Sequence, residues 1–229
     1  MRSKVTPIRI ASELVIWFFI MSAALFGAAG TFLWLEAWLY LVLQFSFSTY
    51  AALWLKKRNP ELLKERMTFC KPTARGWDKA YIWISTGLFI LYLILPGLDA
   101  MRYGWSEVPV FVKAAGFLGI VVSFAVIFVV MKENPYLSRV VEIQKERGHR
   151  VVDTGPYRYV RHPMYAGAVI LFLSIPLALG SYWTLVPALS LIILLLLRTR
   201  FEDKVLHEEL EGYRAYAKRT KYRILPGVW

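Results

Sequence analysis

Five long stretches without a charged side chain limit what this chain can fold into. Four of them, residues 14–35, 37–55, 80–98 and 114–131, approach the roughly 20 residues that a helix needs to cross the hydrocarbon core of a bilayer. Of the 229 residues, 57% are hydrophobic and only 19% are charged, and a soluble domain of this size could not bury so much apolar surface. We therefore expect an all-α fold and a polytopic integral membrane protein.

The fifth stretch, residues 163–197, has 35 residues and is too long for one crossing. A single helix of this length would extend about 52 Å, against a hydrocarbon core of about 30 Å. A break at Gly180 and Ser181 divides the stretch into two short legs, which Pro176 and Pro187 can bend. The sequence thus predicts a helical hairpin near the C-terminus and about six transmembrane helices in all.

Positive charge is distributed unevenly between the predicted loops. With the N-terminus placed in the cytosol, 26 of the 28 Lys and Arg residues fall on the cytosolic side, and only Arg102 and Lys113 fall outside. This is the positive-inside pattern, so we expect both termini in the cytosol, in the plasma membrane of a prokaryote or the endoplasmic reticulum of a eukaryote. Such a basic surface faces anionic lipid headgroups, which argues against the nucleic-acid partner that a net charge of +12 would suggest.

The N-terminal stretch and the single cysteine add smaller expectations. The first apolar stretch follows basic residues, as in a signal peptide, but its 22 uncharged residues favour an uncleaved anchor over cleavage near Ala28 and Ala29. Cys70 is the only cysteine, which excludes an internal disulfide and predicts an ordinary reduced thiol. No group of Cys and His residues has the spacing of metal ligands, so we expect no metal.

The chain divides into two parts by content. Residues 1–131 hold the first four predicted crossings, and the connection 59–77 is expected to include a short surface helix. Residues 132–229 begin with a 30-residue polar segment, too long for a simple connector. In residues 198–221, apolar side chains recur at spacings of three and four, which predicts an amphipathic C-terminal helix at the membrane surface.

The predicted hairpin brings two charged motifs to the same membrane face. Residues 161–165 (Arg-His-Pro-Met-Tyr) precede it and residues 198–203 (Arg-Thr-Arg-Phe-Glu-Asp) follow it, and Arg198 and Glu202 share one helix face. The simplest alternative is a set of snorkelling arginines with a surface ion pair. His149 and His162 are open to the same two interpretations, as structural hydrogen-bonding residues or as functional ones.

The segment GHRVVDTGPYRYVRHPMYAG, followed by the hairpin and by FEDKVLHEELEGYRAY, resembles the isoprenylcysteine carboxyl methyltransferase and phospholipid methyltransferase family over roughly residues 132–225. This resemblance implies a membrane methyltransferase that binds S-adenosylmethionine at the cytosolic face. It would transfer a methyl group to a lipid-like or small hydrophobic acceptor, of the isoprenylcysteine carboxylate type or the phospholipid amine type. Residues 132–229 would then be the cofactor-binding catalytic part.

The resemblance also implies roles for individual residues. Arg198 would face the acceptor and, with Glu202 and His162, form the catalytic set. The implied cofactor-binding residues are Gln144, His149, Arg150, Val151, Val152, Tyr157, His162, Pro163, Met164, Tyr165 and Glu202. The chain departs from the family pattern in having Asp203 in place of a second Glu, in the tighter spacing between Gln144 and His149, and in a stretch before Tyr213 that is one residue short.

Two other functions remain open from the sequence. The ending TKYRILPGVW and the Arg-His-Pro segment also resemble the C-terminal part of membrane sterol reductases, which use a nicotinamide cofactor but have more crossings. A non-enzymatic scaffold or small transporter is the other alternative, although the first four crossings lack the internal charges of an ion pathway. The acceptor atom is also open: a carboxylate is already ionised at neutral pH, whereas an amine must first lose a proton.

Overall fold

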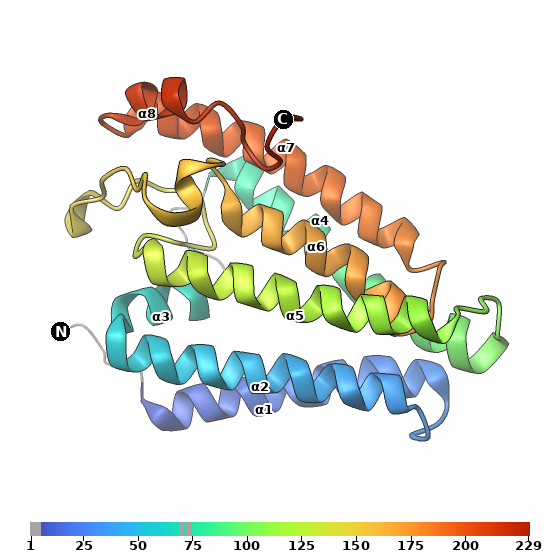
Figure 1. Ribbon diagram of the computed structural model, residues 1–229. Coiled ribbons are helices and arrows are strands. Elements are labelled where there is room, and N and C mark those ends of the chain that lie inside the picture. Colours follow the sequence, from blue (N-terminus) through green and yellow to red (C-terminus); the bar gives the residue numbers. More distant parts are fainter. Residues whose placement is uncertain (1–5, 69–70, 72–74) are drawn as a thin grey trace.

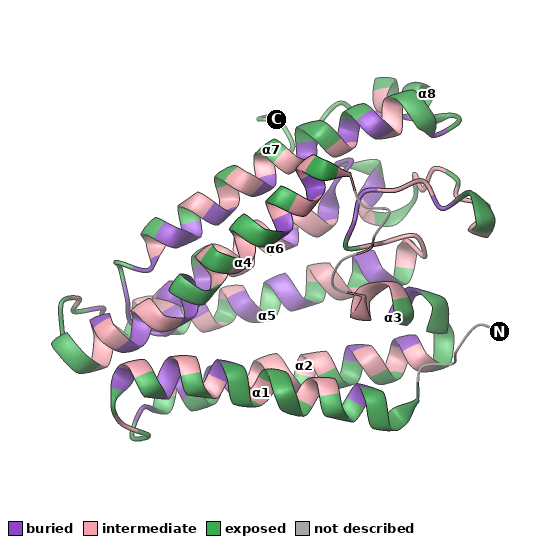
Figure 2. Ribbon diagram, turned by 180° about the vertical axis from the view of Figure 1, so that it is seen from behind, coloured by how far each residue is buried: buried purple, intermediate pink, exposed green. Residues whose placement is uncertain are grey.

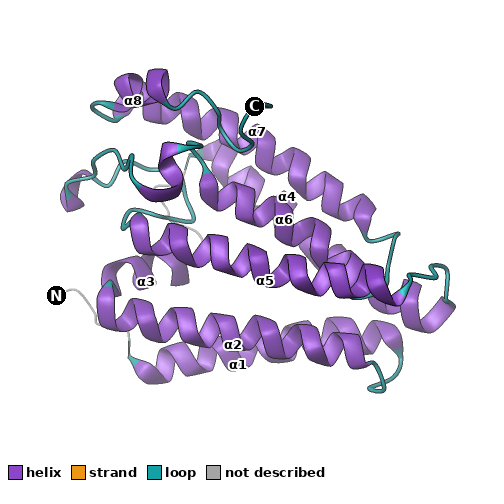
Figure 3. Cartoon of the chain, viewed as in Figure 1, coloured by secondary structure: helices purple, strands orange, loops and turns teal. Residues whose placement is uncertain are grey.

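The computed structural model describes residues 6–68, 71 and 75–229, so the expectation for Cys70 lies outside the described residues. The described part is helical and contains no strand (Figure 3). Its α-helices are α1 (Pro7–Ala29), α2 (Leu35–Arg58), α3 (Pro60–Met67), α4 (Gly76–Pro96), α5 (Val110–Glu133), α6 (Pro163–Ala178), α7 (Leu185–Glu209) and α8 (Tyr213–Arg219). A π-helix, η1 (Gly97–Tyr103), extends α4, and the short 3₁₀ turns η2 (Lys145–Arg147) and η3 (Gly155–Arg158) lie in the polar segment. The predicted all-α fold is confirmed.

Four of the described helical segments are long and apolar enough to cross a membrane: α1, α2, α4 with η1, and α5. This agrees with a multi-pass integral membrane protein. Large apolar side chains are exposed along α1 and α2, where Figure 2 shows many exposed positions among intermediate and buried ones; examples are Phe19, Ile20 and Val42. A bilayer covers such faces, because lipid tails are as apolar as these side chains.

The C-terminal hairpin forms where the uncharged stretch predicted it. α6 begins at Pro163, α7 begins at Leu185, and Gly180 in the turn between them has a φ of +78°, a left-handed conformation that favours glycine. α6 packs on α5 and α7, and α7 packs on α4 (Figure 1). The hairpin therefore belongs to the same bundle as the first four long helices.

The predicted amphipathic C-terminal helix over residues 198–221 is wrong as a single element. Residues 198–209 continue the second hairpin leg within α7, and a separate short helix, α8, follows Gly212, whose φ is +80°. Residues 197–203 contain no helix-breaking residue. The change from apolar to charged side chains changes the surroundings that suit the helix, but the backbone can remain helical. One helix thus extends from the hairpin turn to the charged motif.

Close approach of α5 and α6 fixes the hairpin against the bundle. A Cβ atom added to Gly116 of α5 would lie 2.8 Å from the carbonyl oxygen of Ser174 and closer still to the backbone nitrogen of Ala178. Ser123 of α5 donates a hydrogen bond to the carbonyl oxygen of Gly167 at 2.8 Å. Small residues of this kind allow membrane helices to pack backbone to backbone.

The short α3 confirms the helix expected in the 59–77 connection. Asn59 caps it by accepting a hydrogen bond from the Leu62 N–H at 3.0 Å, and Pro60 occupies the first helical position. Leu62 and Leu63 are buried in a cluster with α1, α2 and α5, so α3 packs into the bundle with one face. In Figure 1, α3, α8 and the 134–162 segment gather at one end of the bundle.

Candidate functional site

A cavity of about 410 Å³ lies at this end of the bundle, between α3, the 134–162 segment, α4, α6 and α7. Ten of the twelve site residues predicted from the sequence line it: His149, Arg150, Val151, Val152, Tyr157, His162, Met164, Tyr165, Arg198 and Glu202. Gln144 and Pro163 do not. The structure thus brings together residues that are up to about 50 positions apart in the chain; their roles in binding stay predictions.

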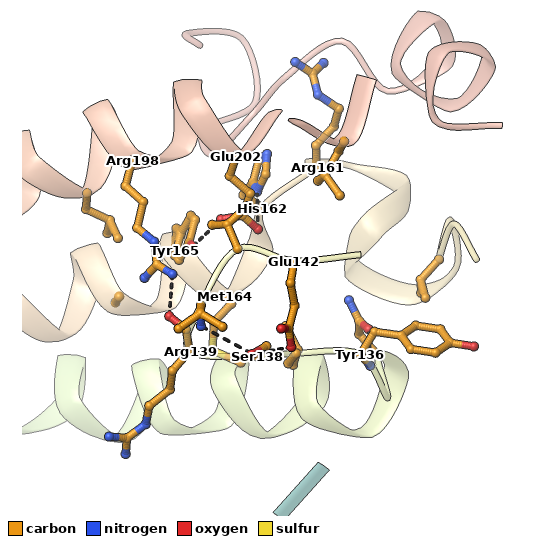
Figure 4. Close-up of a pocket in the computed structure, with 18 of the residues that line it drawn as sticks. Tyr136, Ser138, Arg139, Glu142, Arg161, His162, Met164, Tyr165, Arg198 and Glu202 are labelled. Atoms are coloured by element: carbon orange, nitrogen blue, oxygen red, sulfur yellow. Dashed lines mark hydrogen bonds and ion pairs between the residues drawn. The ribbon is translucent and has the colours of Figure 1, made fainter. Parts of the chain in front are cut away.

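Glu202, His162 and Tyr165 form one group inside the cavity (Figure 4). The Tyr165 hydroxyl donates to a Glu202 carboxylate oxygen at 2.5 Å, and His162 Nδ1 lies 3.9 Å from the other. The His162 and Tyr165 rings are stacked, with centroids 5.6 Å apart. Pro163 starts α6 directly after His162. Tyr165 therefore lies in the first turn of the helix, close to His162.

Asp203, which the family resemblance aligns with a second Glu, is not part of the cavity lining and lies in a buried network. Arg161 donates to both of its carboxylate oxygens at 2.9 Å, the Tyr213 hydroxyl donates at 2.8 Å, and Arg223 Nε donates at 3.0 Å. His162 Nε2 lies 3.3 Å from the same carboxylate. Asp203 therefore joins α7 to the start of α6 and to the C-terminal segment. It contacts His162 at Nε2, the ring nitrogen opposite the one that faces Glu202.

Arg198 is fixed by groups outside its own helix. Its Nε lies 3.2 Å from Asp78 Oδ1. Its Nη2 donates to the Arg139 carbonyl oxygen at 2.5 Å, a contact that Figure 4 marks with a dashed line. The guanidinium also lies over the ring of Tyr81, 4.6 Å from its centroid. The side chains of Arg198 and Asp78 are 10% and 0% exposed, so the alternative of a surface ion pair between Arg198 and Glu202 is wrong.

The loop before α6 supplies an aromatic wall. His149 stacks on Tyr136 with ring centroids 4.5 Å apart, and its Nδ1 accepts a hydrogen bond from the backbone N–H of Gln144 at 3.3 Å. Burial, with the nearby charge of Arg147, lowers the pKa of His149 to about 4. His149 is therefore neutral at physiological pH and presents a flat, uncharged ring.

Gln144 shapes this loop from outside the cavity. Its side-chain amide donates to the Tyr136 carbonyl oxygen at 2.7 Å, and its carbonyl oxygen accepts from Arg147. Tyr157 is held on two sides: its hydroxyl accepts from Asn134 at 2.7 Å, and its carbonyl oxygen accepts from the Tyr216 hydroxyl at 2.8 Å. Burial raises the pKa of Tyr157 above its usual value, so its hydroxyl stays protonated.

Sequence reasoning missed the residues that α3 and α4 contribute. Arg66 and Tyr81 line the cavity, and the buried Asp78 lies behind Arg198. Asp78 is the single acid in the first turn of α4, next to a long apolar stretch. An acid at that position is the one sequence feature that could have indicated a role for Asp78 in the site. Within the described residues, no group of three His, Cys, Asp or Glu side chains could hold a metal ion.

Comparison with known proteins adds a second line of support. The model of the phospholipid methyltransferase family matches residues 114–211. This segment is a phospholipid methyltransferase family domain. The Drosophila melanogaster lamin-B receptor is 32% identical to this chain over 101 residues, which cover 42% of the chain and 14% of the receptor's length.

The matched segment contains most of α5, the loop, α6 and α7, and with them every cavity residue predicted from the sequence. It overlaps the resemblance over residues 132–225 and begins earlier, in α5. Arg66, Asp78 and Tyr81 lie before the domain, so the cavity is completed by helices outside the matched segment.

Proposed function

We propose that this protein is an S-adenosylmethionine-dependent methyltransferase acting in the membrane on a lipid-like or small hydrophobic acceptor. The observation that carries the proposal is the meeting of Arg198 and Glu202, one turn apart on α7, with His149, Tyr157 and His162 around one cavity inside a methyltransferase family domain. Polar groups converge there at the end of an apolar bundle, as expected where a polar cofactor and an apolar acceptor must meet.

The residues present fit the cofactor. The cavity volume is within the range of small-molecule sites, and the stacked rings of Tyr136 and His149 offer a flat surface for an adenine. Val151 and Val152 add apolar lining, and Glu202 offers a carboxylate for the ammonium group at the amino-acid end. When bound, the cofactor supplies a methyl group on a sulfonium: the S–C bond breaks with its electron pair left on sulfur, and a lone pair of the acceptor forms the new bond.

In this arrangement, Glu202 holds the cofactor and Arg198 orients the acceptor. Tyr165 donates to Glu202 and so fixes the direction of its carboxylate. Asp78 and the Arg139 carbonyl oxygen hold Arg198, whose planar fork suits a carboxylate or a phosphate. The enzyme's contribution is mainly positioning, because the donor group is already activated.

The two acceptor classes place different demands on these residues. A carboxylate acceptor is ionised at neutral pH and needs no base. An amine acceptor must be neutral to attack, and Glu202, or His162 between the carboxylates of Glu202 and Asp203, is placed to take its proton. The inner lining from Ile82, Phe172 and Leu195 would receive the apolar part of either acceptor.

We further propose that α6 and α7 are the fifth and sixth crossings, with both termini in the cytosol. α6 has 16 residues, and residues 185–197 of α7 carry no charge. Legs of about 20–25 Å cross the core where the bilayer thins around a short hairpin. This orientation puts the cavity at the cytosolic face, where the cofactor is dissolved, and leaves its apolar lining in the membrane.

Methyl transfer in membranes tests the proposed function. Membranes containing the wild-type protein are incubated with methyl-labelled S-adenosylmethionine and total lipid extract, and label in the organic phase is counted. We expect label above the level of matched membranes containing Glu202→Gln. Equal labelling with the two proteins would contradict the proposal.

A further inference from the structure

The cavity carries more positive charge than the protein neutralises. Its lining includes five arginines but only two glutamates. Arg161 is neutralised by Asp203 and Arg198 by Asp78, while Glu142 accepts from Lys71 outside the cavity lining. The remaining arginines of the lining are Arg66, Arg139 and Arg150.

Arg66 differs from the other two in its surroundings. Arg139 and Arg150 are exposed, and the Arg139 side chain in Figure 4 points away from Arg198 and Tyr165. Arg66 is only partly exposed and has no hydrogen bond or ion pair with any described residue. The remaining residues, 1–5, 69–70 and 72–74, contain no Asp or Glu that could neutralise it.

The acids nearest to Arg66 in the chain are committed elsewhere. Glu65 pairs with Lys71 at 2.5 Å, and Glu61 pairs with Arg147 at 3.0 Å. Arg147 and Glu142, the second partner of Lys71, both belong to the polar segment, so these pairs dock α3 against it. As a result, Arg66 lies at the cavity, within electrostatic reach of Tyr157 and Tyr165.

A guanidinium in this position needs a negative partner. Burial, with the nearby charge of Arg139, lowers the pKa of Arg66 to about 10, yet the group stays protonated at neutral pH. Removing an unpaired charge from water costs free energy, and a sulfonium cofactor alone would add a further positive charge to the cavity. An oxyanion on a bound ligand would offset both.

We propose that Arg66 binds a carboxylate or phosphate group of a ligand in this cavity. The inference rests on the proposed function, which offers two sources of that chemistry. One is the carboxylate at the amino-acid end of the cofactor, and the other is the anionic group of the acceptor. In both cases the guanidinium donates two N–H groups to two oxygens, an arrangement that lysine cannot reproduce.

The test compares Arg66→Gln and Arg66→Lys with Lys64→Gln, which removes one exposed charge from the same helix. Melting temperature and elution in detergent establish that each variant is folded. Calorimetry then gives the affinity for S-adenosylhomocysteine and for decarboxylated S-adenosylmethionine. Initial rates give the KM for N-acetyl-S-farnesylcysteine and for phosphatidylethanolamine.

Two results support the inference and identify the source of the oxyanion. If Arg66→Gln loses about 10-fold or more in affinity for S-adenosylhomocysteine but not for the decarboxylated compound, Arg66 binds the cofactor carboxylate. If cofactor affinity is kept and the acceptor KM rises by a similar factor, Arg66 binds the acceptor. In both cases Arg66→Lys recovers only part of the loss and Lys64→Gln matches the wild type.

Two results overturn it. In the first, Arg66→Gln is folded and has the same affinities and KM values as Lys64→Gln. In the second, Arg66→Gln loses affinity equally for the carboxylated and the decarboxylated compound, and the acceptor KM does not change. If the wild type binds no S-adenosylhomocysteine, the proposed function fails and inorganic phosphate decides the inference alone. At constant ionic strength, phosphate should then raise the melting temperature of the wild type and not that of Arg66→Gln, and equal responses reject an oxyanion site.

Discussion

Arg198 and Glu202 have separate partners although they are one turn apart on the same helix. Arg198 contacts Asp78 and the Arg139 carbonyl oxygen, whereas Glu202 accepts from Tyr165 and faces His162. Their direct contacts are therefore separate, although Glu202 also lies within electrostatic reach of Arg198. This separation makes a division of labour between cofactor and acceptor testable.

Arg198→Lys is expected to lose turnover while cofactor affinity stays near the wild-type value, because lysine keeps the charge but not the planar fork. Glu202→Gln is expected to weaken cofactor binding by about 1–3 kcal/mol, because a charge-assisted hydrogen bond becomes a neutral one. Cofactor affinity and initial rate are measured for each variant, with Lys204→Gln, an exposed site on α7, as the control. Near-wild-type values for both variants would reject the assignment.

His149 gives a prediction on pH. Its pKa is about 4 in the folded protein and about 6.5 when unfolded, so the unfolded state binds a proton first as the pH falls. The stability that neutral His149 contributes is therefore complete above about pH 6.5 and is lost as the pH falls toward 4. Melting temperatures in detergent should fall more steeply between pH 7 and 5 for the wild type than for His149→Gln. Parallel curves would show that His149 is not buried as described.

At the scale of helices, the α5–α6 contact decides whether the site can form. Gly116→Ala adds a Cβ atom against the backbone of Ser174 and Ala178, and overpacking of this kind costs about 1–3 kcal/mol. Gly87 of α4 has open space around its Cα, and Gly87→Ala serves as the control, expected to be neutral or stabilising. Melting in detergent distinguishes the two. Equal melting temperatures would contradict the close approach of α5 and α6.

The sequence was informative about local features of the elements and the site. The uncharged stretch and Gly180 located the hairpin, and the motifs around His149, His162 and Glu202 located ten of the residues that line the cavity. The sequence did not predict which residues of other helices complete the site. Asp78 and Arg66 come from α4 and α3, and their positions depend on how these helices pack, which no local spacing encodes. The continuity of α7 was missed for a related reason, because amphipathicity reports the environment of a helix and not its ends.

At the scale of the whole molecule, the arrangement in the bilayer is the main prediction. In a Cys70→Ser background, Tyr182→Cys in the hairpin turn should react with an impermeant thiol reagent from outside intact cells, since Tyr182 is exposed. Tyr159→Cys, also exposed, should react only after permeabilisation. Reporters fused at residues 1 and 229 should both give cytosolic signals. Labelling of both cysteines from the same side would show that the hairpin does not cross.

The cavity joins these scales, because it needs both the side chains of α7 and the packing of α6 on α5. We propose above all that this cavity binds S-adenosylmethionine. Titration calorimetry on the detergent-purified wild-type protein tests this directly, with S-adenosylhomocysteine in one experiment and a reduced nicotinamide nucleotide in another. The account predicts saturable, single-site binding of S-adenosylhomocysteine and none of the nicotinamide nucleotide. Binding of the nicotinamide nucleotide without binding of S-adenosylhomocysteine would contradict it.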